Sequence, residues 1–295
     1  MTHELIAKEQ LSRYFKVRVE EIELLDRLKG GMSNSNYVIK INDKLYTFRI
    51  PGKNAFAFVD RAIEQQTLDL IKPLAIDGNL LIHLEQNTGY KISHYVEGTA
   101  LMTLDPSEYY HKAAQVLKKL HHSNLKAQND YAPFDRIQKY EKLVETEGIH
   151  HKPNYYDILQ RFLAFKPFLE TFPKTLCHND SQPSNFIVRP DGSLLLVDWE
   201  FGGNNDPLYD IACFGNNDFK FAIGLLPVYL GRTPDKTEWL RLYLWRTFQC
   251  LQWHNVALYK EAIGLSQELH LDFKAIAEAY IVKANALFET ALTYR

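Results

Sequence analysis

Alternating apolar and polar positions predict paired β-strands in the first third of the chain. Residues 36–50 follow the pattern strand, turn, strand, with Asn42-Asp43-Lys44 at the turn. A segment with helical periodicity follows at 61–71, and residues 80–84 and 90–96 form a second pair of strands. This part of the chain therefore predicts a small, sheet-rich lobe with a helix between its strand pairs.

After Gly98 the periodicity is largely helical, and strands interrupt it only at 186–197. The pattern predicts an α+β protein of two lobes. Residues 1–97 are expected to form an N-terminal nucleotide-binding lobe that includes the hinge, and residues 98–295 a C-terminal catalytic and substrate-binding lobe. A nucleotide is expected in the cleft between the two lobes.

The segment at 186–197 has the pattern of a tight β-hairpin. Phe186–Val188 and Leu194–Val197 are apolar and partly β-branched, which suits short buried strands. Between them, Pro190 presets φ, and Asp191-Gly192 supplies the turn and a residue that accepts positive φ. The residues just outside the two strands are therefore expected to meet.

Three polar residues flank this hairpin, namely Asp180, Asn185 and Asp198. Phosphoryl transfer in kinases needs a carboxylate that orients the attacking hydroxyl and accepts its proton. It also needs an amide oxygen and a second carboxylate to hold Mg²⁺ on the nucleotide phosphates. The alternative is a hairpin with ordinary turn-capping residues, but the spacing, the residue types and the turn together favour a kinase site.

The other end of the predicted cleft is expected to bind phosphate. The glycine-rich stretch 28–36 lets backbone approach a phosphate, and Ser33, Asn34 and Asn36 add neutral donors. A plain hairpin turn would have a similar composition.

A cation on the following strand should contact the nucleotide phosphates. The candidate is Arg49, paired with Glu64 on the next helix, with Lys53 as a second candidate. The alternative is an exposed arginine at a strand end and a solvated helix glutamate.

Composition excludes several other classes of protein. The chain of 295 residues is 46% hydrophobic and 24% charged, with a net charge of −2, so we expect neither a nucleic-acid partner nor an anionic membrane partner. Its best apolar run, Phe221–Leu230, is too short for membrane insertion, and Met1–Phe15 has no signal-peptide pattern. The widely spaced Cys177, Cys213 and Cys250 fit reduced core cysteines, which predicts a cytoplasmic location.

Short motifs lie along nearly the whole chain. They are Gly30-Gly31-Met32-Ser33-Asn34-Ser35-Asn36-Tyr37, Tyr95-Val96-Glu97-Gly98, Ala132-Pro133-Phe134, Lys139-Tyr140-Glu141, Cys177-His178-Asn179-Asp180, Asn185-Phe186, Val197-Asp198-Trp199-Glu200-Phe201 and Asn205-Asp206-Pro207-Leu208-Tyr209-Asp210. In these motifs the chain resembles the aminoglycoside phosphotransferase and choline kinase superfamily, which has a two-lobed, protein-kinase-like fold. Within that superfamily it resembles bacterial choline kinases of the phosphorylcholine pathway. The resemblance implies an ATP-dependent kinase that uses Mg²⁺.

The resemblance also assigns roles to individual residues. It implies that Asp180 is the catalytic base and that Asn185 and Asp198 are the Mg²⁺ ligands. His178 corresponds to the histidine that braces the catalytic loop, and Asp210 to the helix aspartate that binds the loop backbone.

The same resemblance places the hinge residues against the adenine, mainly through their backbone groups. These residues are His94, Tyr95 and Val96, and the alternative for them is an ordinary strand end.

Choline is a quaternary ammonium with one hydroxyl, so its site must use aromatic faces and carboxylates. Asp180 and Glu200 supply two carboxylates near the predicted catalytic centre. Glu200 resembles the glutamate that faces the substrate pocket in choline kinases, and the alternative for it is a capping carboxylate.

The aromatic wall is expected on a helix near the C-terminus, where Trp245, Gln249 and Trp253 recur at a spacing of four residues and are expected to share one face. Such a stripe is more often core than cage. The choline kinases that the chain resembles have Trp-x-x-Trp here; Trp253 matches the first position, but Val256 occupies the second. One wall of the cage is therefore either absent or supplied from elsewhere, by Tyr209, Phe201 or Trp245.

These patterns predict a kinase that transfers the γ-phosphoryl group of ATP to a small, cationic alcohol, with choline as the best single candidate. Alternative acceptors are ethanolamine, thiamine, homoserine, a sugar or an aminoglycoside. A catalytically silent binding protein of this fold is a further alternative. The joint presence of Asp180, Asn185 and Asp198 argues against it.

Overall fold

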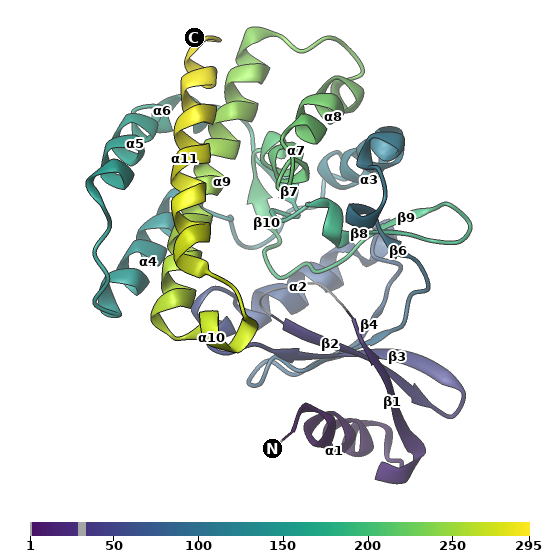
Figure 1. Cartoon of the computed structure of the whole chain (residues 1–295). Helices are drawn as coiled ribbons and strands as arrows, with labels where there is room; N and C mark the ends of the chain where they lie inside the picture. Colours follow the sequence, from purple (N-terminus) through teal and green to yellow (C-terminus); the bar gives the residue numbers. More distant parts are fainter. Residues whose placement is uncertain (1, 29–33) are drawn as a thin grey trace.

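The computed structural model describes residues 2–28 and 34–295 (Figure 1). Its smaller lobe contains an antiparallel sheet with the strand order β1-β2-β3-β5-β4. The hairpin predicted at 36–50 is β2 and β3, paired from Asn34↔Pro51 to Ile41↔Lys44. The strands are β1 (Ile22–Arg27), β2 (Asn34–Ile41), β3 (Lys44–Pro51), β4 (Leu81–Leu84) and β5 (Lys91–His94).

Two helices accompany this sheet. Helix α1 (His3–Phe15) packs on it through Ala7 and Leu11, which are fully buried. Helix α2 (Arg61–Ile71) has the predicted bounds, and Asp60 caps it by accepting from the backbone N–H of Ala62 and Ile63. Its amphipathic pattern places Glu64 on the inner side, where the side chain is fully buried.

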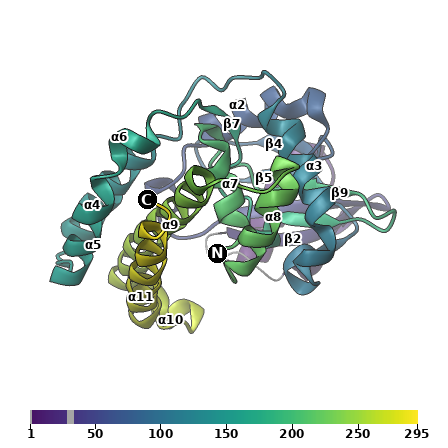
Figure 2. The ribbon, with the colours of Figure 1, turned by 90° about the horizontal axis from the view of Figure 1, so that it is seen from above.

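The larger lobe is mainly helical. Helices α9 and α11 pack along each other, with α4 and α5 on one side of the pair and α7 on the other (Figure 2). None of the helices within the described residues combines the length and the apolar character needed to cross a membrane. The helices of this lobe are α3 (Tyr110–His121), α4 (Pro133–Thr146), α5 (Pro153–Leu163), α6 (Lys166–Leu169), α7 (Pro207–Phe214), α8 (Lys220–Leu230), α9 (Lys236–Ala262), α10 (Leu265–Leu269) and α11 (Phe273–Leu292).

Short strands in the larger lobe carry the segments that flank the predicted site. The predicted hairpin is β8 (Phe186–Val188) paired with β9 (Leu194–Leu196), and β6 (Thr99–Ala100) pairs with β8 on its other side. A second antiparallel pair joins β7 (Thr175–Cys177) to β10 (Gly203–Asn205). The catalytic loop predicted from the sequence therefore runs from β7 to β8.

The α+β architecture predicted from the sequence is confirmed, with a small sheet followed by a helical majority. The strand predicted at Leu194–Val197 ends at Leu196, and Asp198 beyond it has a φ of 66°. The exact division of the chain after residue 97 stays a prediction.

Candidate active site

The catalytic loop holds Asp180 and Asn185 in direct contact. Asn185 Nδ2 donates to the Asp180 backbone oxygen at 2.8 Å and to Asp180 Oδ2 at 3.0 Å. Gln182 Nε2 lies 3.2 Å from each carboxylate oxygen of Asp180. Burial raises the pKa of Asp180 well above its usual range, and the nearby charges of Asp198 and Glu200 raise it further.

Asp210 at the start of α7 supports this loop from below. Its carboxylate accepts from the backbone N–H of His178 at 2.9 Å and of Asn179 at 2.7 Å, and from His121 Nε2 at 2.9 Å. Burial by itself would raise the pKa of Asp210, but His121 and the other donors outweigh it, so the pKa falls below its usual range. Asp210 is therefore a buried anion that orders the loop backbone.

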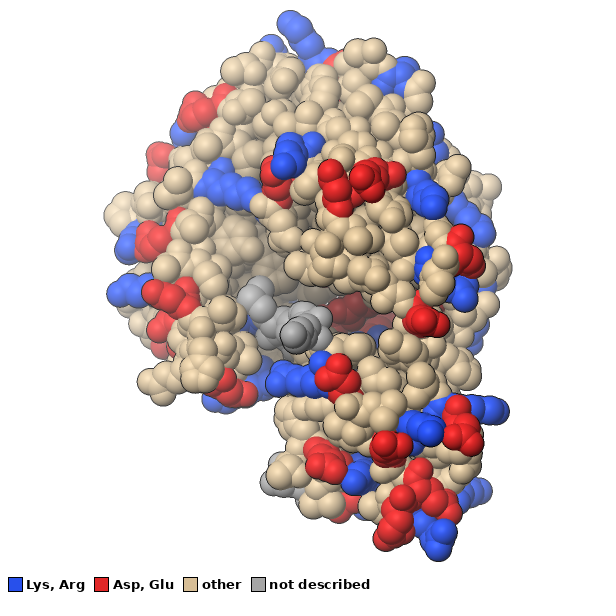
Figure 3. Space-filling model, turned by 45° about the vertical axis from the view of Figure 1, so that its right-hand side comes forward, with Lys and Arg blue, Asp and Glu red and all other residues tan. Residues whose placement is uncertain are grey.

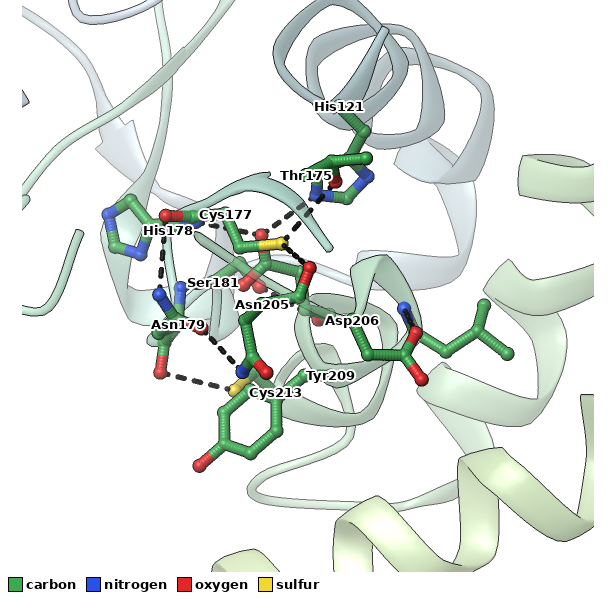
Figure 4. Close-up of polar contacts among 12 residues, drawn as sticks. His121, Thr175, Cys177, His178, Asn179, Ser181, Asn205, Asp206, Tyr209 and Cys213 are labelled. Atoms are coloured by element: carbon green, nitrogen blue, oxygen red, sulfur yellow. Dashed lines mark hydrogen bonds and ion pairs between the residues drawn. The ribbon is translucent and has the colours of Figure 1, made fainter. Parts of the chain in front are cut away.

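Asn179 links the same loop to β10 (Figure 4). Its Nδ2 donates to the backbone oxygens of Phe201 at 3.0 Å and Gly203 at 3.2 Å, and Asn205 Nδ2 donates to its Oδ1 at 2.8 Å. Asn179 itself has a φ of 64°, a left-handed conformation that asparagine tolerates well. The loop is thus attached to the strand that follows Asp198 and Glu200.

His178 connects the catalytic loop to the segment before Asp198. Its Nε2 donates to the Val197 backbone oxygen at 2.9 Å, and its Nδ1 accepts from the Asp180 backbone N–H at 3.2 Å. Burial lowers the pKa of His178 to about 4, so the ring is neutral and can make both bonds. These contacts fit the expectation that His178 braces the catalytic loop.

The two predicted metal ligands present oxygens of the right chemistry. Asn185 commits its Nδ2 to Asp180, and its Oδ1 accepts from Ser184 Oγ at 3.5 Å, a long contact that a cation would replace. The Asp198 side chain is 36% exposed, and its Oδ1 lies 3.7 Å from Arg49 Nη1. Amide and carboxylate oxygens are the ligands that Mg²⁺ prefers, and a cation here would relieve the repulsion that raises the pKa of Asp180. The donor set therefore fits Mg²⁺.

A buried ion cluster lies on the small-lobe side of the cleft. The two terminal nitrogens of Arg49 each donate to one oxygen of Glu64 at 2.7 Å, and Lys91 Nζ lies 3.0 Å from Glu64 Oε1. Arg49 and Glu64 are 2% and 0% exposed, so solvent screens this pair very little. Burial alone would raise the pKa of Glu64, but Lys91, Arg49 and Arg61 hold it well below its usual range.

The glycine-rich stretch ends beside Glu200. Asn34 Nδ2 donates to Glu200 Oε2 at 3.2 Å, so Asn34 faces the predicted substrate carboxylate. Asn36 lies on β2 opposite Arg49 and is half-buried. Ser33 lies outside the described residues. Lys53 donates to the Ile263 backbone oxygen at 2.8 Å, at the end of α9, and Arg49 alone of the two cations pairs with Glu64.

A cavity of about 430 Å³ lies between the start of β2, the end of β3 and helices α9 and α10. Glu200 forms part of its wall. Lys53 of the smaller lobe and Lys260 of the larger lobe also line it. Figure 3 shows that the molecule is hollowed between the lobes, with acidic side chains visible inside. The aromatic side chains of the cavity are Phe58, Tyr140, Phe201 and Trp253.

The structure does not bring Tyr209 and Trp245 to this cavity. Tyr209 is 1% exposed, and Trp245 is 2% exposed and donates its Nε1 to Asp206 at 2.8 Å. An α-helix turns by 100° per residue, so positions 245 and 253 point about 80° apart. The expectation that Trp245 and Trp253 share a face is therefore wrong. Val256 does line the cavity, at the position where the family resemblance led us to expect tryptophan.

The predicted hinge follows β5. His94 ends that strand and stacks on Tyr46 with ring centroids 6.1 Å apart, and the Tyr95 backbone N–H donates to the Leu45 oxygen at 3.2 Å. Val96 is half-buried beyond it. Contact of these three residues with adenine stays a prediction.

Two cations of the ion cluster, Arg61 and Lys91, were not predicted from the sequence. Arg61 precedes Glu64 by three residues, so helical spacing places both on one face of α2. Lys91 is paired with Arg49 across β3 and β5, a register that the sequence did not reveal. Phe58 and Tyr140 were not predicted as cavity residues, although Tyr140 lies in one of the motifs of the family resemblance. Nothing local in the sequence places them in the same cavity as Glu200.

Comparison with known proteins decides the family. A model of the choline/ethanolamine kinase family matches residues 25–230. The chain belongs to the choline/ethanolamine kinase family. A curated relative, protein LicA of Haemophilus influenzae, is 26% identical over 249 residues, which cover 80% of this chain and 73% of LicA.

Solved structures agree with this membership. The choline kinase LicA from Streptococcus pneumoniae superposes with a TM-score of 0.80 at 25% identity, covering 97% of this chain and 99% of LicA. A structure of LicA in complex with AMP gives 0.80 at 26% identity, covering 99% and 100% of the two chains. The protein-kinase-like fold is therefore confirmed. The protein is a nucleotide-binding phosphotransferase that acts on a hydroxyl group of a small molecule.

Proposed function

We propose that this kinase transfers the γ-phosphoryl group of ATP to the hydroxyl of choline. The observation that carries the proposal is the contact of Asp180 with Asn185, together with a cavity that is lined by aromatic rings and by Glu200, whose charge acts on Asp180. In this reaction the bond from the γ-phosphorus to the bridging oxygen of ADP breaks, and a bond from phosphorus to the acceptor oxygen forms. The hydroxyl proton passes to the Asp180 carboxylate.

Asp180 suits the role of base because its surroundings favour the protonated form. A carboxylate whose pKa is raised by burial and by neighbouring anions accepts a proton more readily than a solvated one. Gln182 and Asn185 hold both of its oxygens in place, so the carboxylate keeps one orientation toward the acceptor.

Asn185 and Asp198 would hold Mg²⁺, which supplies neutralising charge at the nucleotide phosphates when it is bound. Arg49 adds a fixed cation on the opposite side of the cleft, and Glu64 fixes its guanidinium in one plane. Asn36 would contact the phosphates, and His94, Tyr95 and Val96 would contact the adenine.

Choline as acceptor is supported by the composition of the cavity. Quaternary ammonium groups bind to aromatic faces and carboxylates, and Trp253, Phe201 and Glu200 line the same cavity. Val256 replaces one aromatic wall, which lowers the preference for three methyl groups and makes ethanolamine a second candidate. The free cysteines Cys177, Cys213 and Cys250 are buried, which supports a cytoplasmic location.

The test is an assay of ADP release with Mg-ATP over a panel of acceptors, with an Asp180→Asn variant as control. The panel contains choline, ethanolamine, thiamine, homoserine, a hexose and an aminoglycoside. We expect the highest kcat/KM with choline and ethanolamine second. A higher kcat/KM with another member of the panel would contradict the proposed acceptor, and no release with any of them would contradict the kinase itself.

A further inference from the structure

Arg61 on helix α2 contacts Glu200, which lines the cavity proposed above to bind the acceptor and called the acceptor cavity from here on. We infer that Arg61 is the positioning residue that presents Glu200 to the acceptor. Arg61 Nη1 donates to Glu64 Oε2 at 2.7 Å and to Glu200 Oε2 at 2.9 Å. The three side chains are all buried, so water competes little with these charged contacts. The inference rests on the proposed function, because it concerns the acceptor site of that reaction.

The two oxygens of Glu200 have different surroundings. Oε2 accepts from Arg61 and from Asn34 Nδ2 at 3.2 Å, and it lies 3.7 Å from Arg49 Nη1. Within residues 2–28 and 34–295, Oε1 takes part in no hydrogen bond. A carboxylate is planar, so donors that fix one oxygen also fix the direction of the other. Arg61 and Asn34 therefore leave Oε1 as the oxygen that meets an ammonium or hydroxyl group in the cavity.

Arg61 differs in this respect from the other cations that contact Glu64. Lys91 Nζ lies 3.0 Å from Glu64 Oε1, and Arg49 holds Glu64 with two hydrogen bonds. Among the described residues, Arg61 is the cation within hydrogen-bond distance of both Glu64 and Glu200. Glu64 keeps two cationic partners without Arg61, whereas Glu200 loses its shortest contact. The effect of removing Arg61 should therefore fall on the acceptor site.

Steady-state kinetics with choline and ATP varied separately tests this inference, with Arg61→Met compared to Lys91→Met. Both substitutions remove one cation from Glu64, but only Arg61→Met removes a partner of Glu200. We expect Arg61→Met to raise the KM for choline about tenfold to a hundredfold, the usual effect of losing a buried, charge-assisted hydrogen bond. The KM for ATP should change by less than about threefold. Lys91→Met should leave the KM for choline within about threefold of the wild type.

The variant Glu200→Gln separates positioning from a structural effect. If Arg61 acts through Glu200, the double variant Arg61→Met/Glu200→Gln has about the same KM for choline as the more impaired single variant. Effects that multiply in the double variant, or equal effects of Arg61→Met and Lys91→Met on choline, would overturn the inference.

Two further outcomes are informative. If Arg61→Met does not yield folded protein, Arg61→Gln is measured in the same way, and an unchanged KM for choline would again overturn the inference. Wild-type protein that releases no ADP with any alcohol contradicts the proposed function. An active wild type whose choline KM is insensitive to Arg61 contradicts only the role of this arginine.

Discussion

The catalytic loop and the acceptor cavity are assembled in different ways. The loop between β7 and β8 holds its groups through bonds from neighbours in the sequence, from Asp210 and from residues 197–205, which follow the hairpin. The cavity takes its walls from β2, the segment after β3, α4, the segment after β9, α9 and α10. Reaction type is therefore encoded in a short segment, whereas acceptor choice depends on packing between distant elements.

The two tryptophans of α9 show what this difference means. Trp245 belongs to the core, where its ring lies 5.4 Å from Tyr209 and its Nε1 binds Asp206. Trp253, two turns later, lines the cavity and is half-buried. One helix thus supplies both the interior of the larger lobe and the acceptor wall, and substitutions in it separate stability from substrate binding.

The largest effect is expected from the loop. Asp180→Asn keeps the size of the side chain and removes the proton acceptor, so kcat should fall by about 10²–10⁴-fold. The KM for ATP should stay close to the wild type, because the nucleotide contacts proposed above do not use Asp180. The melting temperature of the variant with Mg-ATP serves as the control for folding, and near-normal turnover would show that the loop does not supply the base.

A substitution on the buried side of α9 should lower the stability of the protein and not its affinity for the acceptor. Trp245→Ala removes a fully buried ring and its hydrogen bond to Asp206, and we expect the free energy of unfolding to drop by about 3–5 kcal/mol. Urea denaturation monitored by circular dichroism measures this loss. A KM for choline that rises while stability is unchanged would place Trp245 at the acceptor after all.

A pH effect should come from the same helix. Burial lowers the pKa of His254 to about 4, below its ordinary value of about 6.5. The unfolded chain therefore binds a proton that the folded chain excludes, so stability is present above pH 6.5 and is lost as the pH falls toward 4. Between pH 7.5 and 5 this histidine should account for about 2 kcal/mol.

The control for this effect is His254→Asn, which keeps a donor for the Ala277 backbone oxygen. Urea titrations at the two pH values should show a pH-dependent loss of stability in the variant that is smaller by that amount. An identical loss in both proteins would mean that His254 is not the titrating group.

The smallest effect is expected at the cavity wall. Trp253→Ala removes one aromatic face from a cavity that keeps Phe58, Tyr140 and Phe201, so the KM for choline should rise about tenfold, the usual contribution of one cation–π contact. The melting temperature should change much less than in Trp245→Ala. An unchanged KM for choline would show that Trp253 serves packing and is not an aromatic wall of the acceptor site.

The sequence predicted the features that depend on neighbouring residues. Helix α2 has the predicted bounds, and the pairing of Arg49 with Glu64 followed from a strand end and a helix position that kinases use in the same way. The hairpin between Asn185 and Asp198 followed from Pro190 and Asp191-Gly192.

The features that the sequence did not predict depend on register and helix phase. Lys91 reaches Glu64 because β5 pairs with β3 at Arg49, and no local pattern fixes that register. Arg61 lay within a correctly predicted helix, but its contact with Glu200 joins positions 139 residues apart. Trp245 was wrongly assigned to the acceptor site because residues four positions apart were taken to lie on one face of the helix. Over eight residues the helix turns far enough to separate Trp245 from Trp253.

The central claim, transfer of phosphate from ATP to choline with Asp180 as the base, is tested most directly by analysis of the products. ³¹P NMR of a reaction with Mg-ATP and choline follows the phosphate ester and ADP in one sample. We expect the phosphate ester of choline and ADP to form in equal amounts with wild-type protein, and at least about a hundredfold more slowly with Asp180→Asn. ADP that forms with inorganic phosphate alone, or an Asp180→Asn variant that makes the ester at the wild-type rate, would contradict it.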